Sequence, residues 1–378
     1  MQIEKVYEKK EDCCGCSACF NACPKKAISM EKDNEGFLYP SINKDLCINC
    51  ELCQKVCAFK ERDDKSTFIE GYAAKHNDNK VYDNSRSGGA FIALASMILK
   101  KNGYVFGVAL DENFVAKHIC VSSKEDLVKL QGSKYVQSEK CETFKEIESL
   151  LQTNNYVLFS GVACEVAGLL SYLKIKNVNT DKLITVDIVC HGVPSPRVWK
   201  DNIENQIRKH GKLLKADFRD KRFGWKPHIE SYTHQKKTYY DNVYTSIFYD
   251  SVALRRSCHI CHFANKNRPG DITLADFWGS ADFGVTPESK GLSLVLINTK
   301  KGQEYFDLSK DKLKLEKIDH TKDIPQPNLH RPTPVSPKRD EFWKDYEKKG
   351  YRKTFKRYYG VVNHARLVYN KLRCFSKL

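Results

Sequence analysis

The sequence predicts an α+β chain in which a small cysteine-rich N-terminal domain precedes a larger α/β body with a mixed sheet and a basic C-terminal tail. Three observations carry this prediction. Nine cysteines fall within residues 13–57, and eight of them form two runs of one spacing. From about residue 68, short apolar stretches alternate with amphipathic ones, as strands alternate with helices in α/β proteins. The 378 residues, 41% of them apolar, suffice for two or three compact units.

Composition also limits the setting and the partners. No apolar run reaches the roughly 18 residues of a membrane span, and no apolar run follows the charged N-terminus, so we expect a cytoplasmic protein without a signal peptide. In a reducing compartment, sixteen cysteines indicate metal binding or catalysis rather than disulfides. The formal charge of +16 first suggests nucleic acid. That charge counts every thiol as neutral, however, and it also suits anionic cofactors or an acidic partner. We therefore expect no nucleic-acid ligand.

Residues 1–60 contain two cysteine runs typical of bacterial ferredoxins. Each run has the spacing C-x2-C-x2-C-x3-C, in which three thiolates hold one 4Fe–4S cluster and the fourth reaches the other cluster. Zinc is the alternative, but zinc sites normally use two C-x2-C pairs that are separated by a dozen or more residues. The spacing predicts a first cluster on Cys13, Cys16, Cys19 and Cys57, and a second on Cys47, Cys50, Cys53 and Cys23.

Residues 68–150 begin the predicted body. "FIEGYAAKH" alternates like a strand, a helix is expected from Ser87 to Asn102, and "YVFGVAL" is expected to be the next strand. The Ser-Gly-Gly turn before the helix can seat a phosphate or can be a plain helix cap. "GSKYVQS" offers a glycine turn beside a cation, or an ordinary solvated turn.

Residues 151–324 contain two buried strands that each end near a cysteine, Cys164 and Cys190. Functional groups of an open α/β sheet gather at the carboxyl ends of its strands, so these two thiols can converge. The pair Cys258 and Cys261 has no second pair after it. We therefore predict a third 4Fe–4S cluster on these four residues, with zinc or purely structural thiols as the alternatives. Four further cysteines are expected to be bystanders: Cys14, Cys120, Cys141 and Cys374.

Seven motifs between about residues 70 and 335 together resemble the coenzyme F420 hydrogenase/dehydrogenase beta-subunit family. They are "SRSGGAF", "GSKYVQS", "LFSG-x-x-C-x-x-AGL", "VCHGVPSP", "FRDKRFGWK", "CHICHFAN" and "RPGDITLADFWG". The resemblance implies an iron–sulfur flavoprotein body that binds FAD, with an FAD-associated part in 68–150 and an iron–sulfur/flavin part in 151–324. Two departures lie beside site residues, Val162-Ala163 in "SGVAC" and Ala275 in "LADFWG", and they leave the electron acceptor open.

The same resemblance implies which residues bind the cofactor. They are Ser85, Arg86, Ser87, Gly88, Gly89, Gly132, Ser133, Lys134, Tyr135, Gln137, Lys221 and Lys226. The lysines and the arginine among these residues, together with Arg222, are expected to bind the phosphates of the cofactor. The alternative is that they are ordinary surface charges. The candidate catalytic residues are His191, as a proton donor to the flavin or a hydrogen-bonding neighbour of a cluster, and Asp276, as a partner of the ring or substrate or a turn cap.

Residues 325–378 are expected to form a proline-rich strap and then a basic tail. The stripe Val361, Ala365, Val368, Leu372 and Phe375 predicts an amphipathic helix, which either contacts an anionic membrane or a partner, or docks on the body.

These features predict an oxidoreductase. Ferredoxin clusters carry single electrons and a hydride carrier accepts two, so a flavin belongs between them. The acceptor is a redox partner protein or a small molecule, with coenzyme F420 as the first candidate. The alternative is a ferredoxin-linked reductase of a biosynthetic intermediate, such as a polysaccharide or isoprenoid precursor, which does not use F420.

Overall fold

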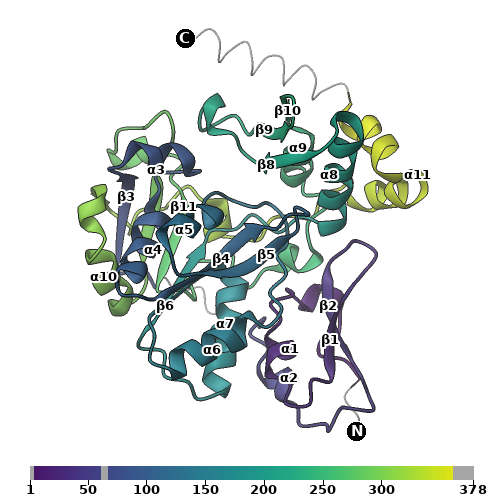
Figure 1. Cartoon of the computed structure of the whole chain (residues 1–378), viewed down its shortest axis with the longest axis horizontal. Helices are drawn as coiled ribbons and strands as arrows, with labels where there is room; N and C mark the ends of the chain where they lie inside the picture. Colours follow the sequence, from purple (N-terminus) through teal and green to yellow (C-terminus); the bar gives the residue numbers. More distant parts are fainter. Residues whose placement is uncertain (1–3, 61–66, 361–378) are drawn as a thin grey trace.

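The N-terminal part of the chain packs directly against a large central sheet. The structure, a computed structural model, describes residues 4–60 and 67–360. In Figure 1 the N-terminal module lies below and beside this sheet, and a smaller sheet with three helices lies above it. The stripe of the predicted tail helix, from Val361 to Phe375, lies outside the described residues.

The N-terminal module is a β-hairpin with two short helices. Strands β1 (Ile28–Lys32) and β2 (Leu38–Ile42) pair antiparallel, and helices α1 (Ala18–Ala22) and α2 (Leu52–Lys55) each lie inside one cysteine run. The turn of the hairpin needs a glycine: Gly36 has φ +85°, and a Cβ atom there would lie 2.7 Å from the backbone nitrogen of Arg197. The module is thus fitted to the body at its tip as well as at its helices.

The body is built on a mixed sheet of eight strands, in the order β13-β3-β12-β11-β7-β6-β4-β5. The strands are β3 (Glu70–His76), β4 (Tyr104–Leu110), β5 (Ala116–Val121), β6 (Val157–Val162), β7 (Leu183–Ile188), β11 (Ile272–Asp276), β12 (Ser293–Ile297) and β13 (Leu313–Ile318). The pairs β4–β6, β6–β7 and β7–β11 are parallel, and the remaining pairs are antiparallel. The expected mixed sheet is confirmed.

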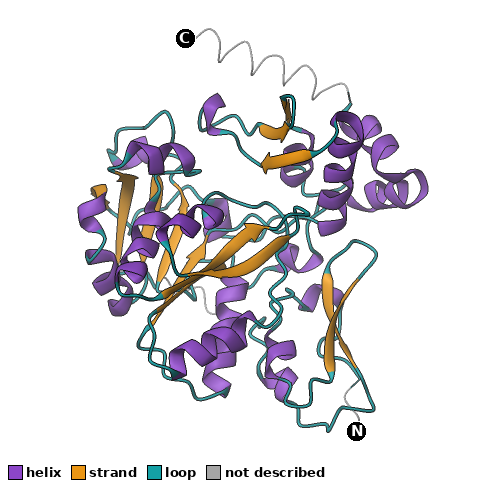
Figure 2. Ribbon diagram, in the orientation of Figure 1, coloured by secondary structure: helices purple, strands orange, loops and turns teal. Residues whose placement is uncertain are grey.

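Helices cover both faces of this sheet, as Figure 2 shows. Strand residues alternate between the two cores: Val157 and Phe159 pack with α6 and α7, whereas Leu158 packs with α4 on the other face. The helices are α3 (Asn79–Asn84), α4 (Ala90–Lys100), α5 (Lys124–Leu130), α6 (Thr143–Gln152), α7 (Ala163–Ile175) and α10 (Lys300–Asp307). The core of the α7 face includes Cys16, Cys19 and Val56, so the N-terminal module and the body share one core.

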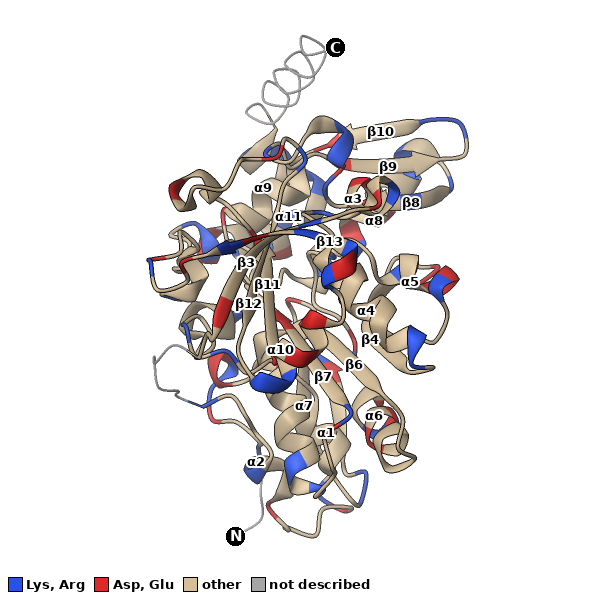
Figure 3. Cartoon of the chain, turned by 90° about the vertical axis from the view of Figure 1, so that its left-hand side faces the viewer, with Lys and Arg blue, Asp and Glu red and all other residues tan. Residues whose placement is uncertain are grey.

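A second layer stands beside the carboxyl ends of the parallel strands. It contains α8 (Pro196–His210), β8 (Leu213–Asp217), β9 (Glu230–His234), β10 (Thr238–Asp241), α9 (Val243–Tyr249) and α11 (Arg339–Tyr359). Short 3-10 turns complete the structure: η1 (Lys10–Asp12), η2 (Lys221–Phe223), η3 (Arg256–Ile260), η4 (Ser280–Phe283), η5 (Lys310–Lys312) and η6 (Pro327–Leu329). In Figure 3 the positions of Lys and Arg and those of Asp and Glu are interspersed along the ribbon. No helix among the described residues is both long and apolar enough to span a bilayer.

The helices and strands lie where the sequence predicts them, but some begin at other residues than predicted. Strand β4 has the predicted bounds, and α8 begins at Pro196 with the Ser195 hydroxyl as its cap. Helix α4, expected from Ser87, begins only at Ala90. Gly89, directly before the helix, has a left-handed φ of +90°, and a Cβ atom at Gly88 would lie 1.8 Å from the carbonyl oxygen of Ala74, so this turn lies against β3 instead of continuing the helix. The domain boundaries given above remain predictions.

Candidate metal centres and cofactor cavity

The eight N-terminal cysteines surround two small cavities. Cys13, Cys16, Cys19 and Cys57 line the first cavity, and Cys23, Cys47, Cys50 and Cys53 line the second. The fourth cysteine of each run therefore lies at the cavity of the other run, as the spacing requires. We call these the first and second cavities.

Both cavities have apolar side chains in their walls beside the thiols. Apart from the thiols, the first is lined by groups such as Val6, Pro40 and Phe59, and the second by Ile28 and Ile42. The backbone N–H of Ala27 donates to the sulfur of Cys23 at 3.3 Å, the kind of hydrogen bond that tunes cluster sulfurs. Among the described residues, no three His, Cys, Asp or Glu side chains converge as a single metal ion requires.

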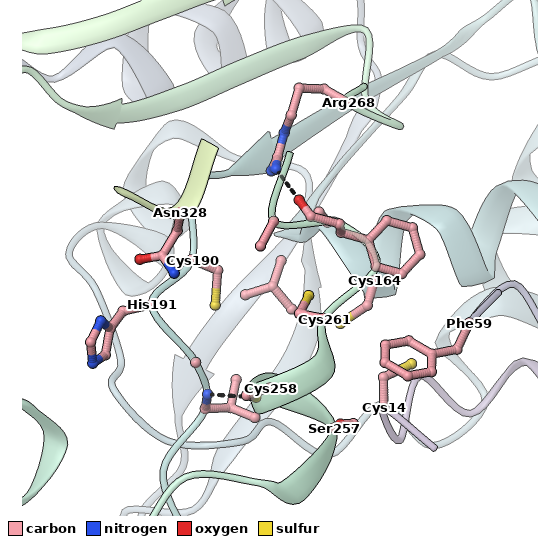
Figure 4. A pocket seen from close by; sticks show the side chains of 16 residues that line it. Cys14, Phe59, Cys164, Cys190, His191, Ser257, Cys258, Cys261, Arg268 and Asn328 are labelled. Atoms are coloured by element: carbon pink, nitrogen blue, oxygen red, sulfur yellow. Dashed lines mark hydrogen bonds between the residues drawn. The ribbon is translucent and has the colours of Figure 1, made fainter. Parts of the chain in front are cut away.

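The four later cysteines meet around a third cavity. Cys164 lies in the first turn of α7, directly after β6, and Cys190 follows the neighbouring parallel strand β7. Cys258 and Cys261 come from η3 and its end. All four line one cavity, and Figure 4 shows them around it together with Phe59 and His191. The backbone N–H of Val193 donates to the sulfur of Cys258 at 3.4 Å.

Burial makes these thiols poor acids on their own. It raises the pKa of Cys258 to about 12 and raises the pKa of Cys190 further. A buried thiol loses its proton when a metal cation binds the sulfur in place of that proton. This set of four thiols therefore fits a positively charged iron centre that binds thiolates. One wall holds the buried ion pair of Arg268 with Asp187, at 2.6 Å.

Two residues lie in the walls of both the first and the third cavity. They are Cys14, which was expected to be a bystander, and Phe59. The Cys14 thiol has hydrogen-bond contacts with Cys16 and with Cys164. The first and third cavities are therefore neighbours that share the side chains of Cys14 and Phe59. The cysteine spacing carries no signal for this, because Cys14 lies outside both metal-binding patterns.

A much larger cavity of about 870 Å³ opens beside the β8–β10 layer. Five predicted cofactor-binding residues line it: Arg86, Gly132, Ser133, Lys134 and Lys221. Its volume falls in the usual range for ligand pockets, roughly 300–1,000 Å³. Many further charged groups line it, so a ligand with several anionic or polar groups suits it better than a purely apolar one.

The charges of this cavity differ in how they are compensated. Arg86 pairs with Asp217 at 2.6 Å. Lys134 donates only to backbone carbonyl oxygens, of Lys129 and Gln131, and Lys221 likewise donates to those of Tyr82 and Ser87. Burial lowers the pKa of each lysine to about 7. Neither lysine has a carboxylate in an ion pair among the described residues, so both can accept an anion.

The other predicted cofactor residues lie outside the lining of this cavity. Ser85, Gly88 and Gly89 are buried, and the hydroxyl groups of Ser85 and Ser87 donate to the carbonyl oxygens of Val81 and Leu292. Tyr135 packs against Phe218 and Phe248. Gln137 donates to the carbonyl oxygen of Cys14 at 3.3 Å, and Lys226 is exposed.

The two candidate catalytic residues occupy different places. His191 lines the third cavity, its ring lies 3.2 Å from the Ser251 hydroxyl, and burial lowers its pKa. Asp276, at the end of β11, accepts from the buried Arg219 at 2.6 Å and from the indole of Trp225 at 3.4 Å. Trp225 stacks on Trp278 with ring centroids 3.9 Å apart.

Comparison with known proteins gives matches to the N-terminal module and to the body. Residues 154–321 match the family described as the C terminus of the beta subunit of coenzyme F420 hydrogenase/dehydrogenase, and residues 12–60 match the 4Fe-4S dicluster domain. The F subunit of F(420)H(2) dehydrogenase from Methanosarcina mazei is 22% identical over 324 residues, which cover 80% of this chain and 84% of that protein. An uncharacterized ferredoxin of Methanocaldococcus jannaschii is 33% identical over 57 residues, covering 15% of this chain and 71% of that protein. A chain in the structure of the F420-reducing [NiFe] hydrogenase complex from Methanosarcina barkeri aligns over 79% of this chain and 93% of its own length, with a TM-score of 0.48 and 16% identity.

Proposed function

Because the chain belongs to the coenzyme F420 hydrogenase/dehydrogenase beta-subunit family and carries a 4Fe-4S dicluster domain, we propose that it is an iron–sulfur flavoprotein oxidoreductase. It transfers electrons between 4Fe–4S clusters and a two-electron acceptor through FAD. A redox partner protein exchanges electrons with the N-terminal clusters.

The observation that carries this proposal is the third cavity. Three segments that are far apart in the sequence bring Cys164, Cys190, Cys258 and Cys261 to one place, and that place adjoins the first cavity through Cys14. Four thiols around an apolar cavity are the donor set of a 4Fe–4S cluster. Three clusters in this arrangement give electrons a continuous route from the N-terminal module into the body.

The FAD is assigned to the large cavity. Lys134 and Lys221 form no ion pair with a carboxylate in the described part of the chain, and Gly132 and Ser133 lie beside them. Phosphate oxygens can be the negatively charged partners of these two lysines. Burial strengthens the attraction between phosphate and ammonium groups. The cofactor, when bound, exchanges one or two electrons at its ring.

Two side chains are assigned supporting roles at the reacting end. His191 lies in the wall of the third cavity, where it orients its ring through Ser251 and can move a proton at Nδ1 or Nε2. Asp276 is held by Arg219 and Trp225 beside the Trp225–Trp278 stack, and it binds and orients a polar group of the ring or the substrate.

The acceptor is assigned as coenzyme F420, because the M. mazei relative belongs by name to an F(420)H(2) dehydrogenase. Mixing the reduced protein with F420 in one sample and with NAD(P) in another tests this step. Reduction of F420 supports it. A fully reduced protein that leaves F420 oxidised excludes F420 and favours the reductase of a biosynthetic intermediate.

The clusters and the flavin are tested by composition. An anaerobically purified sample should contain about twelve irons and about one FAD per chain. Cys258→Ser should remove about four irons and leave the N-terminal clusters in place, whereas Cys120→Ser, a partly buried thiol outside the three cavities, should remove none. Iron and acid-labile sulfide analysis measures this. About eight irons in the unchanged protein would exclude the third cluster, and absence of flavin would exclude the FAD assignment.

A further inference from the structure

Arg255 is a fully buried arginine that reaches from the body into the N-terminal module. It precedes η3, and its backbone N–H donates to the Val193 carbonyl at 3.0 Å. Its side chain donates to the carbonyl oxygens of Cys13 at 2.7 Å and Leu38 at 3.0 Å, and to the Gln137 amide oxygen at 3.0 Å. Gly15 makes room for this group, since a Cβ atom there would lie 3.0 Å from the guanidinium.

The charge of Arg255 lacks an acidic partner among the described residues. The other three buried arginines there each pair with a carboxylate: Arg219 with Asp276, Arg268 with Asp187 and Arg339 with Glu35. The guanidinium of Arg255 instead lies 3.6 Å from the sulfur of Cys13 and 4.0 Å from the centre of the Tyr39 ring.

An uncompensated buried charge is strongly unfavourable, so this position requires negative charge nearby. The thiolates of the first cavity can provide it, with Cys13 in direct contact. Cys258, in the third cavity, also interacts electrostatically with Arg255.

We propose that Arg255 is the fixed positive charge that raises the reduction potential of the first cluster and, more weakly, of the third. This inference rests on the proposed function, because it requires clusters at the cysteine cavities. A cluster that accepts one electron from a donor becomes more negative by one charge, and no proton or bond changes place. A permanent cation in hydrogen-bond contact with a ligand sulfur stabilises the reduced form more than the oxidised form.

The test is an anaerobic redox titration followed by electron paramagnetic resonance, with iron content measured on each sample. Arg255→Gln removes the charge, Arg255→Lys keeps it, and Gln137→Glu places a carboxylate beside the intact arginine. Arg256→Gln is the matched control, since Arg256 is the next residue, is half-exposed and lies 3.6 Å from Glu35.

We expect Arg255→Gln and Gln137→Glu to lower the ratio of reduced to oxidised first cluster about tenfold at a fixed potential, a shift of about 59 mV for one electron. The potential of the first cluster in Arg255→Lys should stay close to that in the unchanged protein. In Arg256→Gln the potential should equal that of the unchanged protein. Unchanged potentials in Arg255→Gln with full iron content would overturn the proposal.

If Arg255→Gln loses iron, Gln137→Glu decides, because it keeps the guanidinium in place; an unchanged potential there also overturns the proposal. These outcomes are distinct from failure of the proposed function. That failure would appear as missing iron or a missing cluster signal in the unchanged protein.

Discussion

At the scale of single residues, two lysines of the large cavity differ from most lysines of the chain. Lys134 and Lys221 are bound to carbonyl oxygens, and burial lowers the pKa of each to about 7. A bound phosphate reverses this effect, because it favours the protonated form. If the proposed FAD binds in this cavity, its binding is coupled to proton uptake by these two side chains.

This coupling predicts how FAD binding depends on pH. Below about pH 7 both lysines are already protonated and the affinity should be constant. Above that pH each must gain a proton on binding, so the affinity should fall by up to about tenfold per pH unit for each lysine. Flavin fluorescence titrations on either side of pH 7 measure the slope.

Lys221→Met should weaken binding and roughly halve that slope, because only one titrating lysine remains. Lys348→Met, an exposed lysine outside the cavity, is the control and should leave both the affinity and the slope unchanged. An affinity that does not change with pH in the unchanged protein would contradict the assignment of both lysines.

Cys14 gives a second prediction at this scale. Its thiol touches both Cys16 and Cys164, but neither set of four cysteines needs it. Cys14→Ala should therefore retain about twelve irons, whereas Cys164→Ala should lose about four. Iron analysis on the two variants compares them directly. Loss of four irons in Cys14→Ala would mean that Cys14 is a ligand.

At the scale of elements, the contact between α1 and α7 fixes the first cavity to the body. Gly168 in α7 allows this close approach, since a Cβ atom there would lie 2.8 Å from the sulfur of Cys16. Cys16 belongs to the first cavity, so helix packing and cluster geometry depend on the same glycine.

Gly168→Ala should for this reason weaken the first cluster although Ala is the better helix former. We expect a lower thermal midpoint and loss of up to about four irons. Lys174→Ala, at an exposed position of the same helix, is the control. Full iron content and an unchanged midpoint in Gly168→Ala would show that α1 and α7 can separate without consequence.

The elements also show what the sequence could predict. The cysteine sets follow from spacing and from strand order, because the carboxyl ends of adjacent parallel strands lie together, as they do for Cys164 and Cys190. Which residues line the large cavity is harder to predict from the sequence. Lys221 and Lys226 share the motif "KRFGWK", yet the η2 turn and Gly224 place Lys221 inside and Lys226 outside. Arg255 has no local signal, since its partners Cys13 and Gln137 lie more than a hundred residues earlier.

At the scale of the whole molecule, the N-terminal module is a fixed part of the body. The ring of Phe59, which follows the second cysteine run, lies 4.8 Å from the His262 ring and 6.1 Å from the Phe263 ring between centroids. With Arg255 and the shared core, this contact holds the three cavities in one order: the second, then the first, then the third.

Because the second cavity is the most exposed, its cluster should be the first that oxygen degrades. Cys50 and the neighbouring Ile48 are exposed, whereas Cys16 and Cys19 are buried. Oxygen should therefore bleach the outer centre first and the inner two later, in a stepwise decay of the brown colour. Spectra recorded during slow aeration, with iron released at each stage, would follow this. Simultaneous decay of all three would mean that the protein shell shelters none of them.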